Sequence, residues 1–182
     1  MVTVPAFVWR HGPILRGLIL GLAVGGFLAA LAWLDSGFLL AGLVAFVVLC
    51  LFYGVWMARR TARYWPSSKL LSGPEREQVA RAARGGQPID DPRLARALID
   101  YRDGLHEAAE KARPFRWVVG VVLVVAVGSA VWDAAFGSWG NAVASCIYLV
   151  MLAFEMFWWP KRQTQLLANA DDAAEMARER TE

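Results

Sequence analysis

The fold is decided by residues 17–58, GLILGLAVGGFLAALAWLDSGFLLAGLVAFVVLCLFYGVWMA, which contain no Lys or Arg. A second stretch of this kind covers residues 117–160, WVVGVVLVVAVGSAVWDAAFGSWGNAVASCIYLVMLAFEMFWWP. One helical crossing of a bilayer takes about 20 residues, so each stretch is long enough for two crossings. Polar or Gly-rich breaks near the middle of each stretch predict four transmembrane helices near residues 14–34, 38–58, 117–133 and 139–159.

The composition supports this assignment. Of the 182 residues, 57% are apolar and nine are Trp, which is more than a soluble core of this size hides. We therefore expect an all-α integral membrane protein, a four-helix bundle of two tandem transmembrane hairpins. Its expected parts are an N-terminal segment with the first hairpin (1–58), a cytoplasmic helical hairpin (59–116), the second hairpin (117–160) and a cytoplasmic C-terminal helix (161–182).

The basic residues predict the orientation, because Lys and Arg next to a membrane span resist translocation. They flank the four helix ends that would share one face, and the two short turns have none. Both termini are therefore expected in the cytoplasm of a cell bounded by a plasma membrane. The net charge of +3 follows from this topology and from contact with anionic lipid headgroups, so we expect no nucleic-acid partner. The flanking cations are Arg10, Arg16, Arg59, Arg60, Arg63, Lys111, Arg113, Arg116, Lys161 and Arg162.

The nine tryptophans fit the same layout. Trp is enriched at both membrane–water interfaces, and none of the nine falls at a predicted mid-depth position. All nine are therefore predicted to be interface anchors: Trp9, Trp56, Trp65, Trp117, Trp158 and Trp159 on the cytoplasmic side, and Trp33, Trp132 and Trp139 on the outer side.

Residues 59–116 carry clear helix punctuation. Ser72, with Glu75 three residues later, predicts a capping box, and the helix is expected to end at two glycines, residues 85–86. Asp91 with Pro92 predicts the start of the next helix. The tail from residue 163 is expected to form a further helix with a weak apolar stripe, which packs against this helical hairpin or, alternatively, against another protein.

A stripe of small residues marks the first transmembrane helix. Gly17, Gly21, Gly25 and Ala29 follow one another at intervals of four, so they share one face and allow another helix to approach closely. The third predicted span has no such stripe. Two alternatives remain for what the stripe contacts: a neighbouring helix of this chain, or a separate subunit.

One acidic residue, Glu155, lies well inside a predicted crossing, about one turn before its cytoplasmic end. A carboxylate at this depth is costly unless it is paired or hydrated, which makes an intramembrane acid a functional candidate. One alternative is an interfacial ion pair, and the other is a proton-coupled or substrate-binding acid. The cations within reach for such a pair are Lys161, Arg162, Arg59 and Arg116.

Motifs for familiar chemistry are missing from the sequence. There is no CxxC, HExxH, phosphate-binding loop or nucleophile elbow, and His11 and His106 are isolated from other metal ligands. We expect no catalytic residue, metal or cofactor, and the two cysteines, Cys50 and Cys146, are expected to be packing residues.

The two halves of the chain also share their punctuation. Pro13 and Pro114 precede the first helix of each predicted hairpin, and Trp33 and Trp132 end it. A duplicated hairpin explains this pattern, and so does the shared need of two hairpins in one orientation for the same interfacial residues.

Residues 72–101, SGPEREQVARAARGGQPIDDPRLARALIDY, resemble a segment of small actinobacterial, mycobacterial-type four-helix membrane proteins of an uncharacterised family. In those proteins a Pro-Glu-Arg helix, a Gly-containing turn and an Asp-Pro-Arg-Leu-Ala helix start recur between membrane segments. The resemblance covers about thirty residues and transfers no active site. It implies an actinobacterial plasma membrane, and it implies as partner a Mce-type lipid importer, an ABC transporter to which the chain would be an accessory subunit.

Three classes of function follow from the sequence. The first is a non-catalytic accessory or modulatory subunit of a larger membrane complex for lipid transport, with membrane lipids and another integral membrane protein as partners. The alternative is a small homo-oligomeric transporter or channel that uses Glu155. A lipid-modifying membrane enzyme comes third, and it would require a polar pocket near Glu155, Tyr53 and Tyr148.

Overall fold

A computed structural model describes residues 4–180, without the side chains of Phe115 and Arg116. Every regular element in this part of the chain is helical, and four helices, α1, α2, α5 and α6, are long and apolar enough to cross a membrane. The all-helical fold and the four candidate spans are therefore confirmed. The elements are η1 (Ala6–Arg10), α1 (Pro13–Ser36), α2 (Leu39–Tyr64), η2 (Pro66–Leu70), α3 (Gly73–Gly85), η3 (Pro92–Leu94), α4 (Ala95–Ala112), η4 (Arg113–Phe115), α5 (Arg116–Phe136), α6 (Trp139–Phe157) and α7 (Trp159–Glu179).

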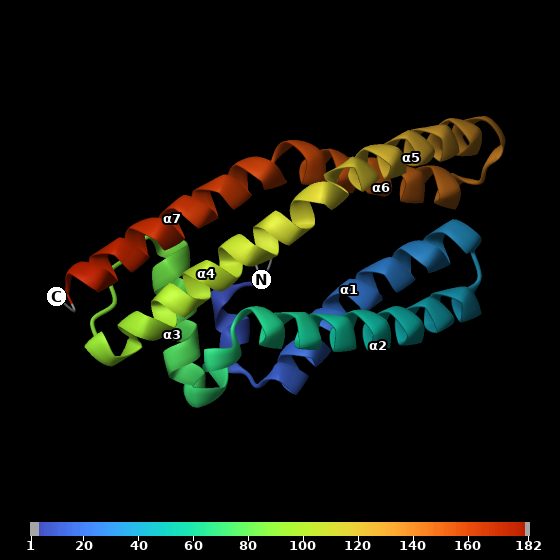
Figure 1. Cartoon of the computed structure of the whole chain (residues 1–182). Coiled ribbons are helices and arrows are strands. Elements are labelled where there is room, and N and C mark those ends of the chain that lie inside the picture. The colour runs from blue at the N-terminus through green and yellow to red at the C-terminus, as the bar shows by residue number, and fades with distance from the viewer. Residues whose placement is uncertain (1–3, 181–182) are drawn as a thin grey trace.

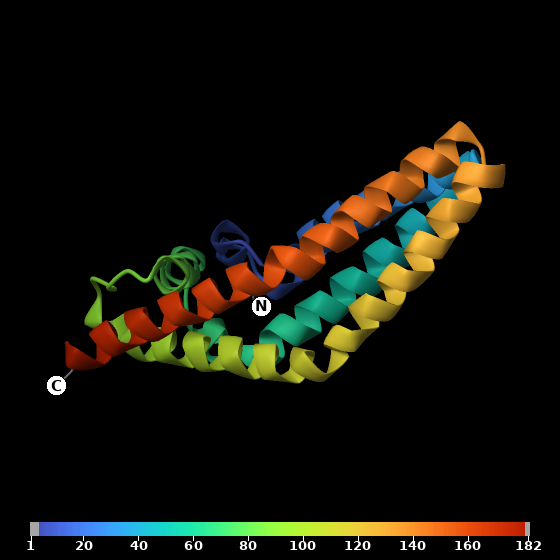
Figure 2. The same ribbon diagram turned by 90° about the horizontal axis from the view of Figure 1, so that it is seen from above.

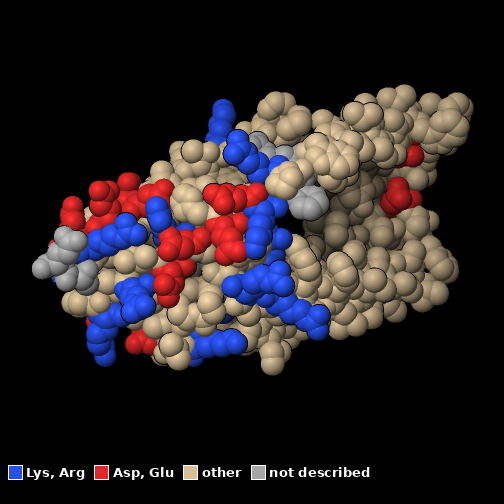
Figure 3. Space-filling view, viewed as in Figure 1, with Lys and Arg blue, Asp and Glu red and all other residues tan. Residues whose placement is uncertain are grey.

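The four apolar helices form two pairs, α1 with α2 and α5 with α6, and the turns of both pairs lie at the same end of the molecule (Figure 1). We call this the turn end. The other end is a helical module made of η1, residues 65–70 with η2, and α3, α4 and α7. Charged side chains crowd the module, whereas the surface of the helix pairs is almost entirely uncharged (Figure 3). This segregation is what a bilayer around the pairs and water around the module require.

The second pair grows out of the module. Figure 2 shows α4 leading into α5 through a bend, and α6 leading into α7 as one long rod. The amide of Trp158 donates to Phe154 O, and that of Arg162 donates to Trp158 O, so helical hydrogen bonding continues from α6 into α7. The α5–α6 pair is therefore an extension of two helices that the module holds.

The α1–α2 pair is held by direct contact between the two backbones. A Cβ atom added at Gly17 would lie 2.6 Å from the carbonyl oxygen of Gly54, and one at Gly21 would lie 2.5 Å from that of Cys50. At Gly25 the added atom would be 2.9 Å from the amide nitrogen of Cys50. Since no side chain fits at these positions, the glycine stripe is filled by α2.

Helix α2 runs beyond residue 58, where the predicted span ends, to Tyr64. Met57, Thr61 and Tyr64 are buried, and the Thr61 hydroxyl donates to Met57 O at 2.9 Å. Arg59 and Arg60 mark the expected edge of the membrane, but the helix continues because its next turn packs against the module. Residue 58 was predicted as the end of the membrane span, and the helix itself ends at Tyr64.

The core of the module is built around three aromatic side chains. Trp9, Trp65 and Tyr101 are fully buried and contact one another edge-to-face, with ring centroids 4.8 to 5.6 Å apart. The prediction that Trp9 and Trp65 are membrane-interface anchors is therefore wrong. Their positions beside Arg10 and after a span resemble interface positions, but an amphipathic ring suits a protein core equally well.

The segment before α1 is fixed to the module by Arg76 on α3. Its guanidinium donates to four backbone carbonyls, those of Trp9 (3.1 Å), Leu71 (3.0 Å), Ser68 (3.3 Å) and Arg10 (3.4 Å). Such charge-assisted bonds are stronger than neutral ones. The turn between η1 and α1 and the turn before α3 are thereby held together.

Arg16 is also buried, although it was predicted as one of the cations that flank the membrane. Its guanidinium carbon lies 3.9 Å from the centre of the Trp9 ring, and Nη2 donates to His11 O at 3.3 Å. A desolvated cation over an indole gains about 2 kcal/mol. Arg16 therefore joins the first turn of α1 to the aromatic core.

Helix α7 packs on α3 and α4, in agreement with the first alternative for the tail. Its apolar stripe is buried, and Asp171 accepts from Arg102 Nε at 2.5 Å and lies 3.0 Å from His106 Nε2. The predicted capping box of α3 is present, and Gly86 has the positive φ of 64° that closes that helix. The buried residues of the stripe are Leu166, Ala170, Ala173, Ala174 and Ala177.

The α1–α2 contact gives a matched pair of substitutions. Gly21→Ala places a methyl group against the Cys50 carbonyl and should cost about 1–3 kcal/mol of stability. Gly26→Ala, whose Cβ would lie 4.0 Å from the Phe46 ring, should be neutral or slightly stabilising because Ala favours helix. Thermal unfolding in mild detergent measures both. Equal stability of the two variants would contradict the backbone contact.

Candidate functional site: the wedge between the helix pairs

The two helix pairs meet at the turn end through α1 and α6. A Cβ atom added at Gly140 would lie 2.5 Å from the carbonyl oxygen of Leu34, and Ala144, one turn later on α6, is fully buried. Leu31 on α1 is buried as well, with 3% of its surface exposed. Small residues on α6 therefore allow a close contact here.

The same face of α6 changes in character towards the module. Residues 148, 152 and 155 continue the spacing of three to four and are Tyr, Leu and Glu in place of Gly and Ala. Tyr148 lies within electrostatic range of Asp35 at the end of α1, and Glu155 lies within range of Tyr53 on α2. This face of α6 therefore looks towards the first pair along its whole length.

The side chains on this face of α6 become larger as the two pairs separate. The pairs touch where α6 carries Gly140 and Ala144, and they diverge towards the module, where it carries Tyr148, Leu152 and Glu155 (Figure 1). Figure 3 shows the resulting hollow between the two arms of the molecule. We call it the wedge: it is closed at the turn end and open at the module end.

At the turn end of the wedge, the second pair is tied by a polar contact. The Ser145 hydroxyl on α6 donates to the Asp133 carboxylate on α5 at 2.5 Å, and the amide of Gly137 donates to the carbonyl oxygen of Asp133 at 2.8 Å. Asp133 is thus satisfied within the turn of its own pair. The Asp133 carboxylate therefore has a structural role: it links α5 to α6 near their turn.

Glu155 is exposed and its carboxylate takes part in none of the ion pairs formed between described side chains. The predicted ion pair with Lys161, Arg162 or Arg59 is therefore not formed. The fourth predicted partner, Arg116, lies outside the described side chains. Glu155 lies on the side of α6 that carries Gly140 and Ala144, towards the open end of the wedge, and it is within electrostatic range of Tyr53 on α2.

Two cations lie beside aromatic rings where α2 meets the module, and one of them, Lys111, is paired with Glu107 at 2.6 Å. The Arg60 guanidinium lies 4.9 Å from the Trp56 ring centre and 5.5 Å from that of Tyr64, and Lys111 Nζ lies 5.5 Å from the same Tyr64 ring. Arg60 is also within electrostatic range of Tyr53. The other predicted flanking cations are exposed: Arg10, Arg59, Arg63, Arg113, Lys161 and Arg162.

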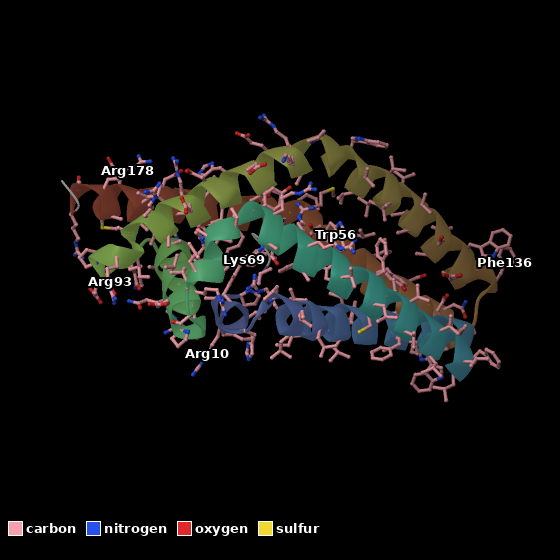
Figure 4. All side chains as sticks on the ribbon, turned by 60° about the horizontal axis from the view of Figure 1, so that its bottom comes forward. Arg10, Trp56, Lys69, Arg93, Phe136 and Arg178 are labelled. Carbon is pink, nitrogen blue, oxygen red and sulfur yellow. The ribbon has the colours of Figure 1, made fainter. Side chains whose placement is uncertain are left out.

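Six of the nine tryptophans are exposed on the apolar helices, as anchors at a membrane interface require. Figure 4 places Trp56 between the module, marked by Lys69 and Arg10, and the turn end, marked by Phe136. Trp159 is half-buried and packs against the module core. The exposed six are Trp33, Trp56, Trp117, Trp132, Trp139 and Trp158.

The wedge brings together few groups for chemistry. Among the described residues no three His, Cys, Asp or Glu side chains come close enough to hold a metal ion, and Cys50 and Cys146 are both free thiols. Sequence reasoning grouped Glu155 with Tyr53 and Tyr148, and the structure places Tyr53 within electrostatic range of Glu155. It did not single out Arg60, which acts on the same Tyr53 phenol. The signal was weak, because the residues lie on helices whose mutual rotation the sequence does not specify.

Comparisons with known proteins add no relative: no family model, no curated protein and no solved structure matches the chain. The geometry of the wedge and of the helix pairs is therefore the basis for function.

The contact that closes the wedge can be opened by substitution. Gly140→Leu forces a side chain against the Leu34 backbone and should lengthen the distance between spin labels at Leu39 and Phe136, two exposed positions near the turns. Gly120→Leu, where nothing lies within 4 Å of an added Cβ, should leave that distance unchanged. Double electron–electron resonance in nanodiscs measures it. If Gly140→Leu leaves the distance between the two spin labels unchanged, the contact of α1 with α6 does not set the angle between the pairs.

Proposed function

We propose that the chain is a non-catalytic accessory or modulatory subunit of a larger membrane complex. In this proposal it crosses the plasma membrane as two tandem hairpins, with the helical module and both termini in the cytoplasm. The flanking cations support that orientation, and the lack of known catalytic motifs in the sequence supports a non-catalytic role. The second helix pair supplies the contact with the partner.

The observation that carries the proposal is the exposure of α5. None of the residues in its most apolar window is buried by the rest of the described chain, whereas the glycine stripe of α1 is filled by α2. A separate subunit was one of the two alternatives for the glycine stripe of the first pair, and α2 occupies that stripe. A separate subunit would therefore meet the second pair.

Two glycines distinguish α5 from an ordinary lipid-facing helix. Gly120 and Gly128 lie little more than two turns apart, and nothing approaches the space that a Cβ would take at either position. A helical Gly costs about 0.5–1 kcal/mol relative to Ala, a cost that close approach of another helix offsets. At Gly21 such a helix is present in the chain, and at Gly120 and Gly128 a partner would provide it.

The resemblance of residues 72–101 leads us to propose which complex this is. An accessory subunit beside the permease of a Mce-type lipid importer, in an actinobacterial plasma membrane, would account for a small protein with a helical module on one side and a free helix pair in the membrane. The partner helix in this proposal belongs to the permease.

Purification from native membranes tests the proposal. A tagged chain in gentle detergent should carry its partner in fixed stoichiometry, and mass spectrometry should identify that partner as an importer permease. Gly120→Leu and Gly128→Leu should lower the recovery of the partner about tenfold or more, as loss of a close helix contact implies. Ala30→Leu, an exposed position of α1, is the control and should have no effect. Recovery of the chain alone, or only as a homo-oligomer, would argue against an accessory role.

One observation favours a second candidate, a small homo-oligomeric transporter or channel: Glu155 lies towards the open end of the wedge without an ion pair among the described side chains. An acid in such a position can couple transport to protons. In sealed vesicles Glu155→Gln should then abolish a proton-linked flux that the unaltered protein supports, measured with a pH-sensitive dye. A flux that survives this substitution removes the residue on which the candidate rests.

A further inference from the structure

Two cations lie on the outer face of α2, where the helix passes from its apolar part towards the module. Arg59 and Arg63 are four residues apart, so they are neighbours one turn apart on the same side of the helix. Both are exposed, whereas Met57, Thr61 and Tyr64 on the opposite side of α2 are buried. The two guanidinium groups therefore lie on the side of α2 that the rest of the described chain leaves uncovered.

Neither of these guanidinium groups has an acidic partner among the described side chains. The ion pairs of the described chain do not include Arg59 or Arg63, and α2 contains no Asp or Glu. The exposed cations at the start of α7, Lys161 and Arg162, are adjacent in the chain and so do not share one side of their helix. Arg59 and Arg63 thus place two uncompensated charges on one helix face.

The same face of α2 changes from apolar to basic in the order found across one leaflet. Phe52, 70% exposed, lies two turns before Arg59, and the exposed side chains of Val55 and Trp56 lie between them. Acyl chains, an aromatic interface and charged headgroups follow one another in this order in a membrane. Arg63 lies about 6 Å beyond Arg59 along the helix, and the interfacial layer is about 5–8 Å thick. Both guanidinium groups are therefore at the height of the lipid phosphates.

We propose that Arg59 and Arg63 bind the phosphate of an anionic phospholipid in the leaflet on the module side. The fork of an Arg guanidinium matches the oxygens of a phosphate, and the acyl chains lie along Phe52 and Val55. A zwitterionic headgroup carries its own cation and therefore compensates the charge of the two arginines poorly. The site rests on α2 crossing a bilayer, and it does not depend on the partner contact proposed for α5.

The shape of this face favours a lipid over a segment of a partner protein. Phe52, Val55 and Trp56 are large, so the face lacks the small residues that let the backbone of another helix approach closely. The cations and the apolar side chains also form one continuous exposed strip along the helix. A ligand that satisfies both parts has an anionic group and apolar chains in one molecule, as a phospholipid has.

Native mass spectrometry of the full-length protein released from nanodiscs tests the proposal. The nanodiscs contain equal amounts of palmitoyl-oleoyl phosphatidylglycerol, phosphatidylethanolamine and phosphatidylcholine. We expect phosphatidylglycerol to be enriched among the lipids that stay bound to the protein. Arg59→Gln and Arg63→Gln should each lower this enrichment about fivefold, the effect of one cation near an anionic surface.

Arg96→Gln is the matched control. Arg96 is exposed like the two arginines of α2, but it lies in the first turn of α4, about 24 Å from the end of that helix. The charge of the headgroups is screened over about 8 Å at physiological salt, so this substitution should leave the enrichment unchanged. Three results overturn the proposal: equal retention of the three lipids, an enrichment that survives both substitutions on α2, or an equal loss in Arg96→Gln.

A photoreactive residue in place of Phe52 separates a lipid from a protein partner. After illumination of native membranes, mass spectrometry should find phospholipids attached at this position, with a larger anionic share than the membrane as a whole. Arg59→Gln combined with Arg63→Gln should remove that excess of anionic lipid. Attachment of a polypeptide in place of a lipid would mean that a partner protein covers this face, and would also overturn the proposal.

Discussion

The contact of the α1 glycines with the backbone of α2 is the constraint on which the rest of the structure depends. It fixes α1 and α2 side by side along most of their length. The residues just before α1 and just after α2 are therefore brought to the same place, where Trp9 and Trp65 meet with ring centroids 5.0 Å apart. Tyr101 from α4 completes the cluster, and burial raises the pKa of its phenol, which stays neutral in the core. One aromatic cluster thus fixes the start of α1 and the end of α2 to the module.

The second pair obeys a different constraint. Its helices are extensions of α4 and α7, so the packing of α7 on α3 and α4 decides the direction in which they leave the module. Only the small residues Gly140 and Ala144 then bring α6 onto α1 at the far end. Close contact between the pairs needs small residues on α6, and these are present only near the turn end. Tyr148, Leu152 and Glu155 take the corresponding places towards the module, where the wedge is open.

The fold was predicted well where the cause is local. Each candidate span was located from hydropathy and length, although α2 continues from residue 58 to Tyr64. The capping box of α3 was located to the residue because Ser72 and Glu75 carry it. The core of the module was predicted poorly because it depends on contacts between distant segments. Trp9 and Trp65 have the sequence context of interface anchors, and Arg16 that of a flanking cation, but their burial depends on α4 and η1. A usable signal did exist for the glycine stripe, since Gly42, Cys50 and Gly54 place small residues on one face of α2.

The two halves of the chain share the residues at the ends of their apolar helices, but the residues within those helices differ. Pro, Arg and Trp recur at matching places, as any two hairpins of one orientation require. The residues between them differ: α1 carries glycines that α2 covers, and α5 carries β-branched residues with two glycines that nothing in the described chain covers. The first pair is therefore packed within the described chain, and the second pair is open. Since dispersion contacts are the main source of helix association in lipid, the open pair gains the most from a further contact.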